Sequence, residues 1–427
     1  MGSSIRKFIP PFLISSYHYL LALAGAFRYA FPTQKIIVIG VTGTKGKSTT
    51  VMLAGKILEE TGVKVAWLTS ATIKVDEKED LNPYHMTMPG RFAVQKFLRQ
   101  AVDAGCKYAL LEVTSEGVKQ HRHRFINFDT AVFTNLKPEH IEAHGSFENY
   151  RFCKGKLFSA TKKNHIINLD DKNVEYFLQF SAANKWGYTI GSPKSKNQTL
   201  DPKFKTVYIE DTNAQSNNIK FSIKTKEFNL KLLGEFNIYN AAAAICIASI
   251  YGVSLEKCKQ ALEGVSIIPG RMETIASKPF KVIVDLAHTP ESFEEVFRFI
   301  KKQAHNRIIA VFGAAGGGRD KWKRPVLGKI AASYADTLIL TNEDPYSEDP
   351  NEILLEIESG VMGAGFEKAN LYKILDREEA IKKSFDMAQD DDIILLLGKG
   401  TEQLMVFSDK KIPWDDRKIA RRLLSKR

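Results

Sequence analysis

The sequence predicts an α/β protein with two successive parallel sheets, each covered by helices. Two observations carry this prediction. Short runs of β-branched and aliphatic residues alternate with helix-like stretches, which is the pattern of a parallel sheet covered on both faces. This series occurs twice, and a polar stretch of short alternating runs separates the two copies. A chain of 427 residues is long enough for two or three domains.

The first series consists of five expected strands, which are residues 35–40, 63–69, 108–113, 130–135 and 165–168. A helix is expected from Ser48 to Glu60. The character of the chain changes after Lys185, where short alternating runs at 205–210 and 218–225 predict a small antiparallel patch. An alanine-rich helix is expected over 237–251.

The second series follows a Pro-Gly pair at 269–270 and has expected strands at 281–285, 307–313, 337–341 and 392–398. We therefore expect three parts: an apolar N-terminal segment (1–34), a central domain (35–268) and a C-terminal α/β domain (269–427). No solenoid repeat or low-complexity tract interrupts them.

The composition excludes several classes of protein. Apolar residues make up 44% and charged residues 26%, so the chain is not disordered, collagen-like or a coiled coil. The net charge of +12 suits an anionic partner, such as a nucleotide, a nucleic acid or a membrane surface, but a merely basic surface is an equal alternative. Four cysteines without a C-x-x-C pair predict neither a zinc site nor a disulfide framework and fit a reducing cytosol.

The N-terminal segment from Phe8 to Phe31 is apolar and aromatic and lacks a convincing signal-peptide cleavage site. Three interpretations stay open: a helix packed on the body of the protein, an anchor lying in a membrane interface, and a membrane-spanning helix. We favour the packed helix, because polar residues and Arg28 interrupt the run and two prolines break its start. No acidic residue precedes Glu59, which favours contact with an anionic surface.

Residues 40–50, GVTGTKGKSTT, form the strongest local motif. Glycines between a strand and a helix let backbone N–H groups surround phosphate oxygens, and the helix N-terminus adds its positive end. Lys47 would reach the terminal phosphates, and the hydroxyl of Ser48 or Thr49 would hold Mg²⁺. Five residues rather than the usual four separate Gly40 from Gly46, with Gly43 in the middle. The motif predicts ATP binding without naming the reaction.

Chemistry-bearing residues follow the later strands of the first series. Glu112 ends a strand, at the edge where open α/β sheets bind ligands. His140 and His144 come just after the next strand, and Lys154 lies on an expected helix. Each alone could be an ordinary structural or surface residue, but their combination with the phosphate loop favours a catalytic site.

Several motifs in order resemble the Mur ligase family. They begin with GVTGTKGKSTT, EVTSEGVKQHR and FDTAVFTNLKPEHIEAHG, and continue with GEFNIYN, GRME, DLAHTPES, GGRDKWKRP, NEDPYSEDP and GKGTE. The resemblance extends from about Lys35 to Leu424. Within the family, the tripeptide synthetases (MurE type) are the most similar, with the family's N-terminal UDP-binding domain replaced by the short apolar segment.

The resemblance implies an ADP-forming amide ligase of peptidoglycan biosynthesis. ATP would phosphorylate the terminal carboxylate of a UDP-N-acetylmuramoyl-peptide, and an amino acid would attack the acyl phosphate. The resemblance also implies two Mg²⁺ ions, the first held by Ser48 or Thr49 and Glu112, and the second by His140 and a carbamylated Lys154. We therefore expect Lys47, Glu112, His140 and Lys154 to be the catalytic set.

Further site residues are carried over from the family's motifs one by one. The expected ATP-binding residues are Gly43, Thr44, Lys45, Gly46, Lys47, Ser48, Thr49, Asn237, Asn240, Arg271, Asp285 and His288. The expected substrate-binding residues are Thr87, Ser115, Gln120, Arg122, Glu343, Asp344, Tyr346, Gly398 and Glu402.

Departures from the family's motifs affect the expected substrate. Enzymes that select meso-diaminopimelate typically carry Asp-Asn-Pro-Arg, whereas this chain has Glu343-Asp344-Pro345-Tyr346. Without that arginine, and with Glu402 nearby, a basic amino acid such as L-lysine is expected in preference to meso-diaminopimelate. Only about 35 residues precede the first strand, so the substrate could be held by its peptide alone or be lipid-linked.

Other readings of the sequence remain as alternatives. A folylpolyglutamate synthetase or another peptide ligase would share the ATPase core, and a non-catalytic nucleotide-dependent scaffold is a third. Nucleic-acid binding is not expected, because the basic stretch Arg417–Arg427 has no base-stacking platform and resembles a solvated helix end. We expect a cytoplasmic monomer, with peripheral membrane contact through the N-terminal segment as an open question.

Overall fold

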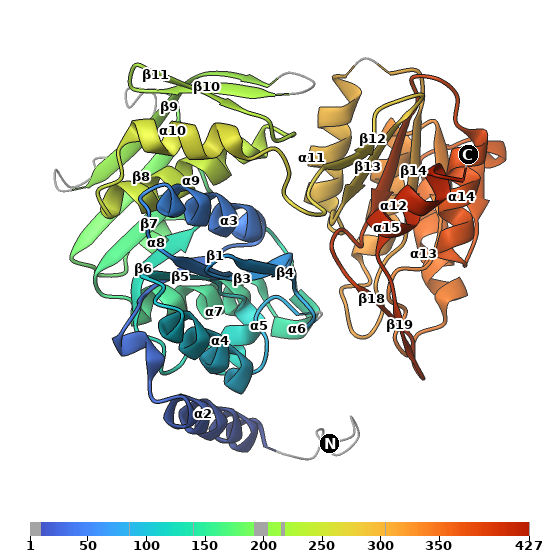
Figure 1. Ribbon diagram of the computed structural model, residues 1–427. Coiled ribbons are helices and arrows are strands. Elements are labelled where there is room, and N and C mark those ends of the chain that lie inside the picture. Colours follow the sequence, from blue (N-terminus) through green and yellow to red (C-terminus); the bar gives the residue numbers. More distant parts are fainter. Residues whose placement is uncertain are drawn as a thin grey trace.

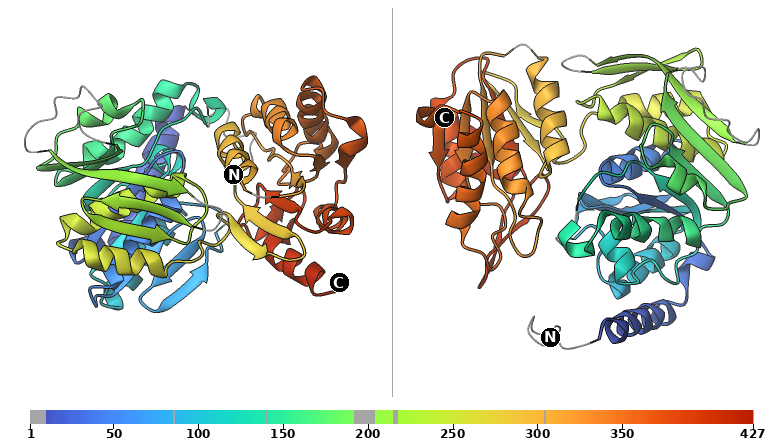
Figure 2. Two further views of the ribbon diagram at one scale, coloured as in Figure 1. Left: turned by 90° about the horizontal axis from the view of Figure 1, so that it is seen from above. Right: turned by 180° about the vertical axis from the view of Figure 1, so that it is seen from behind.

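The computed structural model describes residues 10–84, 86–139, 141–191, 204–214, 218–303 and 305–426. It confirms the predicted α/β fold, with two separate large sheets that are covered by helices and lie side by side (Figure 1 and Figure 2). The first sheet belongs to the N-terminal part of the chain and the second to the C-terminal part.

The first sheet has eleven strands in the described residues, and β1 lies near its middle. In spatial order they are β11 (Lys226–Leu230), β10 (Ile219–Ile223), β9 (Lys205–Ala214), β8 (Asn184–Ile190), β7 (Asn164–Asn168), β6 (Phe128–Phe133), β1 (Ile37–Thr42), β5 (Tyr108–Glu112), β2 (Val65–Leu68), β3 (Thr72–Val75) and β4 (Lys78–Leu81). β1 pairs in parallel with both β5 and β6. The segments that follow β1, β5 and β6 therefore emerge together at one edge of the sheet.

Helices cover both faces of this sheet, as the near-continuous apolar strands require. One face packs against α3 (Lys47–Glu59), α9 (Phe236–Ile250) and α10 (Leu255–Gly264). The other packs against α4 (Arg91–Asp103), α7 (Phe147–Ala160) and α8 (Val174–Leu178). Shorter helices in the connections are η1 (Pro32–Gln34), α5 (Ser115–Lys119) and α6 (Ile141–His144).

The predicted small antiparallel patch is confirmed, because the two predicted runs, β9 and β10, pair antiparallel and β11 extends them. β8 continues the parallel series by pairing with β7, and β9 pairs in parallel with β8. Only β10 and β11 run antiparallel to their neighbours on that side. Short alternating runs indicate strands with one solvated face, but they do not carry the strand direction. The hairpin of β3 and β4, which turns at Asp76 with a positive φ of 56°, was not predicted.

The second sheet is parallel except for one edge strand. In spatial order its strands are β12 (Glu273–Ala276), β13 (Lys281–Asp285), β17 (Ile393–Leu397), β14 (Ile308–Phe312), β15 (Thr337–Leu340) and β16 (Leu371–Lys373). One face packs on α11 (Pro290–Lys301), α12 (Lys323–Tyr334) and α13 (Pro350–Gly363), and the other on α14 (Arg377–Met387) and α15 (Asp416–Leu424). Smaller elements are η3 (Lys368–Asn370), β18 (Leu404–Val406) and β19 (Lys411–Pro413).

The N-terminal segment forms α2 (Pro11–Arg28), which packs on α4 as the outermost layer of the N-terminal part (Figure 1). Among the described residues, no helix combines the length and apolarity that crossing a membrane requires. All four cysteines are free and buried. The solvated character expected of the basic C-terminal stretch is wrong for Arg417, which is 6% exposed and pairs with Asp415.

Candidate active site

A cleft with a volume of about 1380 Å³ lies where the carboxyl edge of the first sheet faces the C-terminal part. Ordinary ligand pockets measure about 300–1,000 Å³, so this cleft has room for more than one ligand. Its lining includes the whole predicted phosphate loop from Gly43 to Thr49, together with Glu112 and Lys154. The structure thus brings together three of the four residues predicted to be catalytic; the fourth, His140, lies outside the described residues.

The phosphate loop needs glycine at two positions. Gly43 and Gly46 have φ values of 151° and 83°, and a Cβ at either would overlap a neighbouring side chain, Thr134 or Asn240. α3 begins at Lys47, directly after the loop, so its free N–H groups point into the cleft. Lys47 Nζ donates to the carbonyl oxygens of Gly43 (3.0 Å) and Thr44 (2.9 Å). This loop can therefore surround an anion with backbone and ammonium donors.

A residue that the sequence did not single out, Asn135, fixes the loop from the neighbouring strand. Its side-chain oxygen accepts the N–H of Lys45 (2.9 Å), and its carbonyl accepts the N–H of Thr44 (2.8 Å). Thr134 adds a hydrogen bond to the Lys45 carbonyl (2.7 Å). Because both residues follow β6, the parallel pairing of β1 with β6 preorganises the loop.

Oxygen donors gather beside the start of α3. Ser48 Oγ lies 2.9 Å from Ser70 Oγ, and Glu112 accepts the N–H of Ser70 (2.7 Å). Arg271 reaches across from the C-terminal part and donates to both serine hydroxyls, at 3.2 Å and 3.0 Å. Hydroxyl and carboxylate oxygens are ligands that suit Mg²⁺. Ser70 was not anticipated, because nothing in its local sequence marks it.

Lys154 is unusually deeply placed for a lysine, at 2% exposure. Its ammonium nitrogen donates to the Gly43 carbonyl (2.7 Å) and stands 4.7 Å from the centre of the Tyr150 ring. Burial, reinforced by the neighbouring cation of Lys47, holds the pKa of Lys154 well below its ordinary value. Burial also lowers the pKa of Lys47. The uncharged amine, which is the nucleophilic form, is therefore more accessible at Lys154 than at an ordinary lysine.

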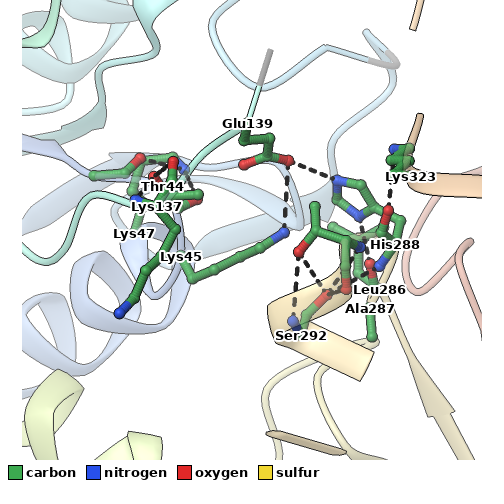
Figure 3. A network of polar contacts seen from close by, with 12 residues as sticks. Thr44, Lys45, Lys47, Lys137, Glu139, Leu286, Ala287, His288, Ser292 and Lys323 are labelled. Atoms are coloured by element: carbon green, nitrogen blue, oxygen red, sulfur yellow. Dashed lines mark hydrogen bonds and ion pairs between the residues drawn. The ribbon is translucent and has the colours of Figure 1, made fainter. Parts of the chain in front are cut away.

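Glu139 links the phosphate loop to the C-terminal part (Figure 3). Its carboxylate lies 3.6 Å from Lys45 Nζ and 3.3 Å from His288 Nε2, and the His288 carbonyl accepts from Lys323 (3.0 Å). Burial and the nearby cation of Lys45 lower the pKa of His288 to about 3. At neutral pH the imidazole is therefore uncharged, and the Glu139–His288 contact is not an ion pair. Glu139 was not predicted, although it adjoins His140.

The predicted nucleotide residues on α9 and β13 differ in their roles. Asn240 lines the cleft, whereas Asn237 lies behind it and accepts from Asn240 (2.8 Å) while donating to Leu233 (2.7 Å). Asp285 accepts the N–H groups of Met272 and Ala287, both at 2.7 Å, and so fixes the backbone on either side of β13's end. Burial raises the pKa of Asp285.

Four predicted substrate residues line the cleft beyond the loop: Thr87, Ser115, Gln120 and Arg122. Arg122 donates to Gln120 (2.8 Å) and to the carbonyl of Met88, and Ser115 Oγ lies 3.0 Å from His144 Nε2. A guanidinium and several hydroxyl or amide groups at one end of the cleft suit a polar, acidic ligand.

The remaining predicted substrate residues form an acidic group in the C-terminal part. Glu343, Asp344, Gly398 and Glu402 line the cleft. Lys399 neutralises part of this charge through Asp344 (2.9 Å) and Glu402 (2.8 Å). Within the described part of the chain, Glu343 Oε2 has no hydrogen-bond partner, and burial raises the pKa of Glu343 to about 7.

Tyr346 lies outside the lining of the cleft. Its ring packs on Gly317, and the guanidinium of Arg319 stands over it, 5.6 Å from its centre. Arg319 itself lines the cleft. Of the described residues, no group of three or more His, Cys, Asp and Glu side chains is arranged to hold a metal.

Comparisons with known proteins agree with the motifs. Residues 41–248 match the model of the Mur ligase middle domain, and residues 270–400 match that of the Mur ligase, glutamate ligase domain. A UDP-N-acetylmuramyl-tripeptide synthetase from Roseiflexus sp. is 36% identical over 95% of this chain and 82% of its own length.

Two solved structures show a similar architecture. A UDP-N-acetylmuramoyl-L-alanyl-D-glutamate–2,6-diaminopimelate ligase has a TM-score of 0.61 and 28% identity, over 94% of this chain and 82% of its own. The folylpolyglutamate synthase of Mycobacterium tuberculosis has a TM-score of 0.69, over 91% and 96%, but only 15% identity. The second likeness therefore concerns the fold alone.

Proposed function

The chain belongs to the Mur ligase family, and from this premise we propose that it is an ATP-dependent, ADP-forming ligase that adds an amino acid to a UDP-N-acetylmuramoyl-peptide. The reaction would pass through an acyl phosphate on the peptide's terminal carboxyl group. The observation that carries this proposal is the convergence of Lys47, Ser48, Glu112 and Lys154 on one phosphate loop inside a cleft formed by both parts of the chain.

Charge is the main obstacle to this reaction, because a phosphate and a carboxylate repel each other. Lys47 and the N–H groups at the start of α3 would hold the terminal phosphates, and Arg271 would add a second cation from the C-terminal side. Mg²⁺ would be held by Ser48 and Glu112, whose oxygens fit it, and would neutralise charge on the phosphates.

We propose that Lys154 is carbamylated in the active protein and that two Mg²⁺ ions take part. An amine with a depressed pKa, buried beside Lys47, has the reactivity that addition of CO₂ requires. The carbamate would convert a buried cation into an oxygen ligand, and His140 would complete the second ion's site. An unmodified, protonated Lys154 would instead repel a divalent ion.

We propose a division of the chain into residues 1–34, 35–268 and 269–427. Closure of the C-terminal part over the nucleotide, through Arg271 and the Glu139–His288 contact, would exclude water from the acyl phosphate. Asp285 supports this closure by ordering the backbone beside Arg271 and His288. The handling of the UDP group and the monomeric state stay predictions.

A basic amino acid such as L-lysine is our proposed co-substrate. Glu343 offers a buried carboxylate oxygen without a partner, which suits the ammonium group of a lysine side chain. Arg319 is the cation that could instead receive the distal carboxylate of meso-diaminopimelate. Lysine would thus be recognised by Glu343 and meso-diaminopimelate by Arg319, and each of these two side chains can be substituted separately.

The test is a phosphate-release screen with UDP-MurNAc-L-Ala-D-Glu and a panel of amino acids. We expect release that depends on both substrates and is faster with lysine than with meso-diaminopimelate. Glu343→Gln should reduce the lysine rate, and Arg319→Gln should leave it intact. Faster turnover with meso-diaminopimelate, lost in Arg319→Gln, would reject the lysine assignment. Release only with a folate and glutamate would reject the proposed reaction in favour of a folylpolyglutamate synthetase.

A further inference from the structure

Most of the large apolar side chains of the helix α2 face away from the body of the protein. A helix that only packs on a protein would be expected to bury them. The buried residues of α2 are small apart from one histidine, namely His18, Ala22, Gly25 and Ala26, with Ile14 and Leu21 partly buried beside them. The backbone at Gly25 comes close to Arg91 and Phe92 at the start of α4. The large side chains lie on the outer face instead: Phe12, Leu13, Tyr17, Leu20 and Phe27 are between 48% and 67% exposed.

These side chains form one continuous surface. At 100° per residue they cover a contiguous arc of the helix, in which Ser16 is the one polar residue. In Figure 1 and Figure 2, no other helix or strand of the described residues lies outside α2. A continuous exposed apolar surface is typical of an interaction site.

The charges near α2 are those that an anionic surface attracts. No Asp or Glu precedes Glu59 in the sequence, Arg28 ends the helix, and the sequence before the helix carries Arg6 and Lys7. His121, which contacts Ser15 and the Tyr19 ring, is surrounded by the cations of Arg91, Arg124 and Lys156. Aromatic and aliphatic side chains beside cations are typical of helices that lie in a membrane interface.

We propose that the outer face of α2 docks on an anionic lipid surface, with the helix lying along the membrane. A second copy of the chain is a poorer fit. An 18-residue helix is about 27 Å long and its apolar face about 10 Å wide, which gives roughly 300 Å². Stable dimers bury about 800 Å² on each partner. The proposal goes beyond the ligase reaction and does not depend on it.

The docked orientation has a consequence for the cleft. His121 lies between Gln120 and Arg122, which both line the cleft, and it contacts α2 directly. Docking through α2 therefore places this end of the cleft nearer to the lipid surface than the phosphate loop.

The test is cosedimentation of the full chain with vesicles of equal parts phosphatidylglycerol and phosphatidylcholine. We expect binding that weakens with salt and with vesicles of phosphatidylcholine alone. The double variant Leu20→Ser, Phe27→Ser should lower the partition constant at least tenfold. Ser16→Leu should raise it several-fold, which a role confined to packing on α4 does not explain. Leu355→Ser, which removes an exposed leucine from α13, is the matched control and should bind unchanged.

Three results would overturn the proposal. The first is equal sedimentation of the full chain and the double variant. The second is equal binding to vesicles with and without phosphatidylglycerol, which would reject the anionic surface. The third is a dimer in light scattering that the double variant dissociates, without vesicle binding, which would assign the face to a second copy. Because none of these readouts uses ligase activity, failure here leaves the proposed reaction untouched, and the reverse also holds.

Discussion

The buried ion pair between Arg377 and Asp416 allows a quantitative prediction about the amino-acid end of the cleft. Both side chains are fully buried, and the guanidinium donates two hydrogen bonds to the carboxylate, at 2.9 Å and 2.7 Å. The same guanidinium donates to the carbonyls of Asn342 (3.1 Å) and Leu397 (2.8 Å). Arg377 thus ties together the ends of β15 and β17, which are followed by Glu343 and Gly398.

Asp416→Asn removes the negative charge and leaves the buried arginine without a counter-ion. Removing one partner of a buried pair costs about 3–5 kcal/mol, because the remaining charge stays desolvated. The exposed i,i+4 pair of Arg99 and Asp103 is the control, since Asp103→Asn should cost less than about 1 kcal/mol. The double variant Arg377→Met, Asp416→Leu should be much closer to wild type than Asp416→Asn, because no charge is then buried.

Urea unfolding measures the free energy of unfolding of each variant. The rate of phosphate release at increasing amino-acid concentration measures the KM for the amino acid. The KM for the amino acid should rise in Asp416→Asn more than the KM for ATP, because the ends of β15 and β17 loosen.

Burial opposes ionisation of Asp416, but Arg377 outweighs it and lowers the pKa of the carboxyl. Its stabilising contribution is therefore present above the ordinary pKa of an aspartate and is lost as the pH falls through the depressed value. Between pH 6 and 8 the loss in Asp416→Asn should be constant; a loss below about 1 kcal/mol would refute the reasoning.

Three further predictions concern the chemistry. Lys154→Ala should lower the rate of phosphate release by at least about a thousandfold, the scale on which one charge-stabilising group counts in phosphoryl transfer, and a short carboxylic acid should restore part of it; a near-normal rate would exclude the metal-bridging role. The pKa of Glu343 is raised to about 7, so its ionised fraction grows between pH 6 and 8, and the KM for lysine should fall up to about tenfold over that range; the same fall in Glu343→Gln would assign it to another group. Gly43→Ala places a Cβ against Thr134, so nucleotide affinity measured by calorimetry should fall at least tenfold, whereas Gly62→Ala, where a Cβ meets open space but φ is also positive, should leave it unchanged.

The sequence was sufficient for those features that depend on local pattern. The phosphate loop, its flanking strand and helix, and Glu112 at the end of β5 all follow from residue types at short spacing. Parallel strands carry their carboxyl ends to one edge, so placing Glu112 beside the loop required only the order of elements. Lys154 lies within α7, and its place in the site was expected from the family's motifs. The antiparallel pairing of β9 with β10 was predicted, but the parallel pairing of β9 with β8 was not, since alternation is the same in both directions.

Contacts between segments that lie far apart in the chain could not be predicted from the sequence. Ser70 meets Ser48 and Glu112 because β2 lies beside β5, and no motif surrounds it. Glu139 is one residue from a motif histidine, yet its contact with His288 depends on how the two parts of the chain meet. The outward-facing apolar side chains of α2 were not predicted for the same reason. The composition of an apolar helix does not show which of its faces contacts α4.

The two parts of the chain meet through the groups that a nucleotide would use, and this couples binding to their relative position. Arg271 donates to Ser48, the hydroxyl proposed to hold Mg²⁺, and Lys47 donates to carbonyls of its own loop. An incoming magnesium nucleotide would compete with both sets of hydrogen bonds, and we expect Arg271 then to donate to the phosphates instead of the serine. Because Arg271 precedes β12 in the C-terminal part, we expect this exchange to couple nucleotide binding to the position of that part.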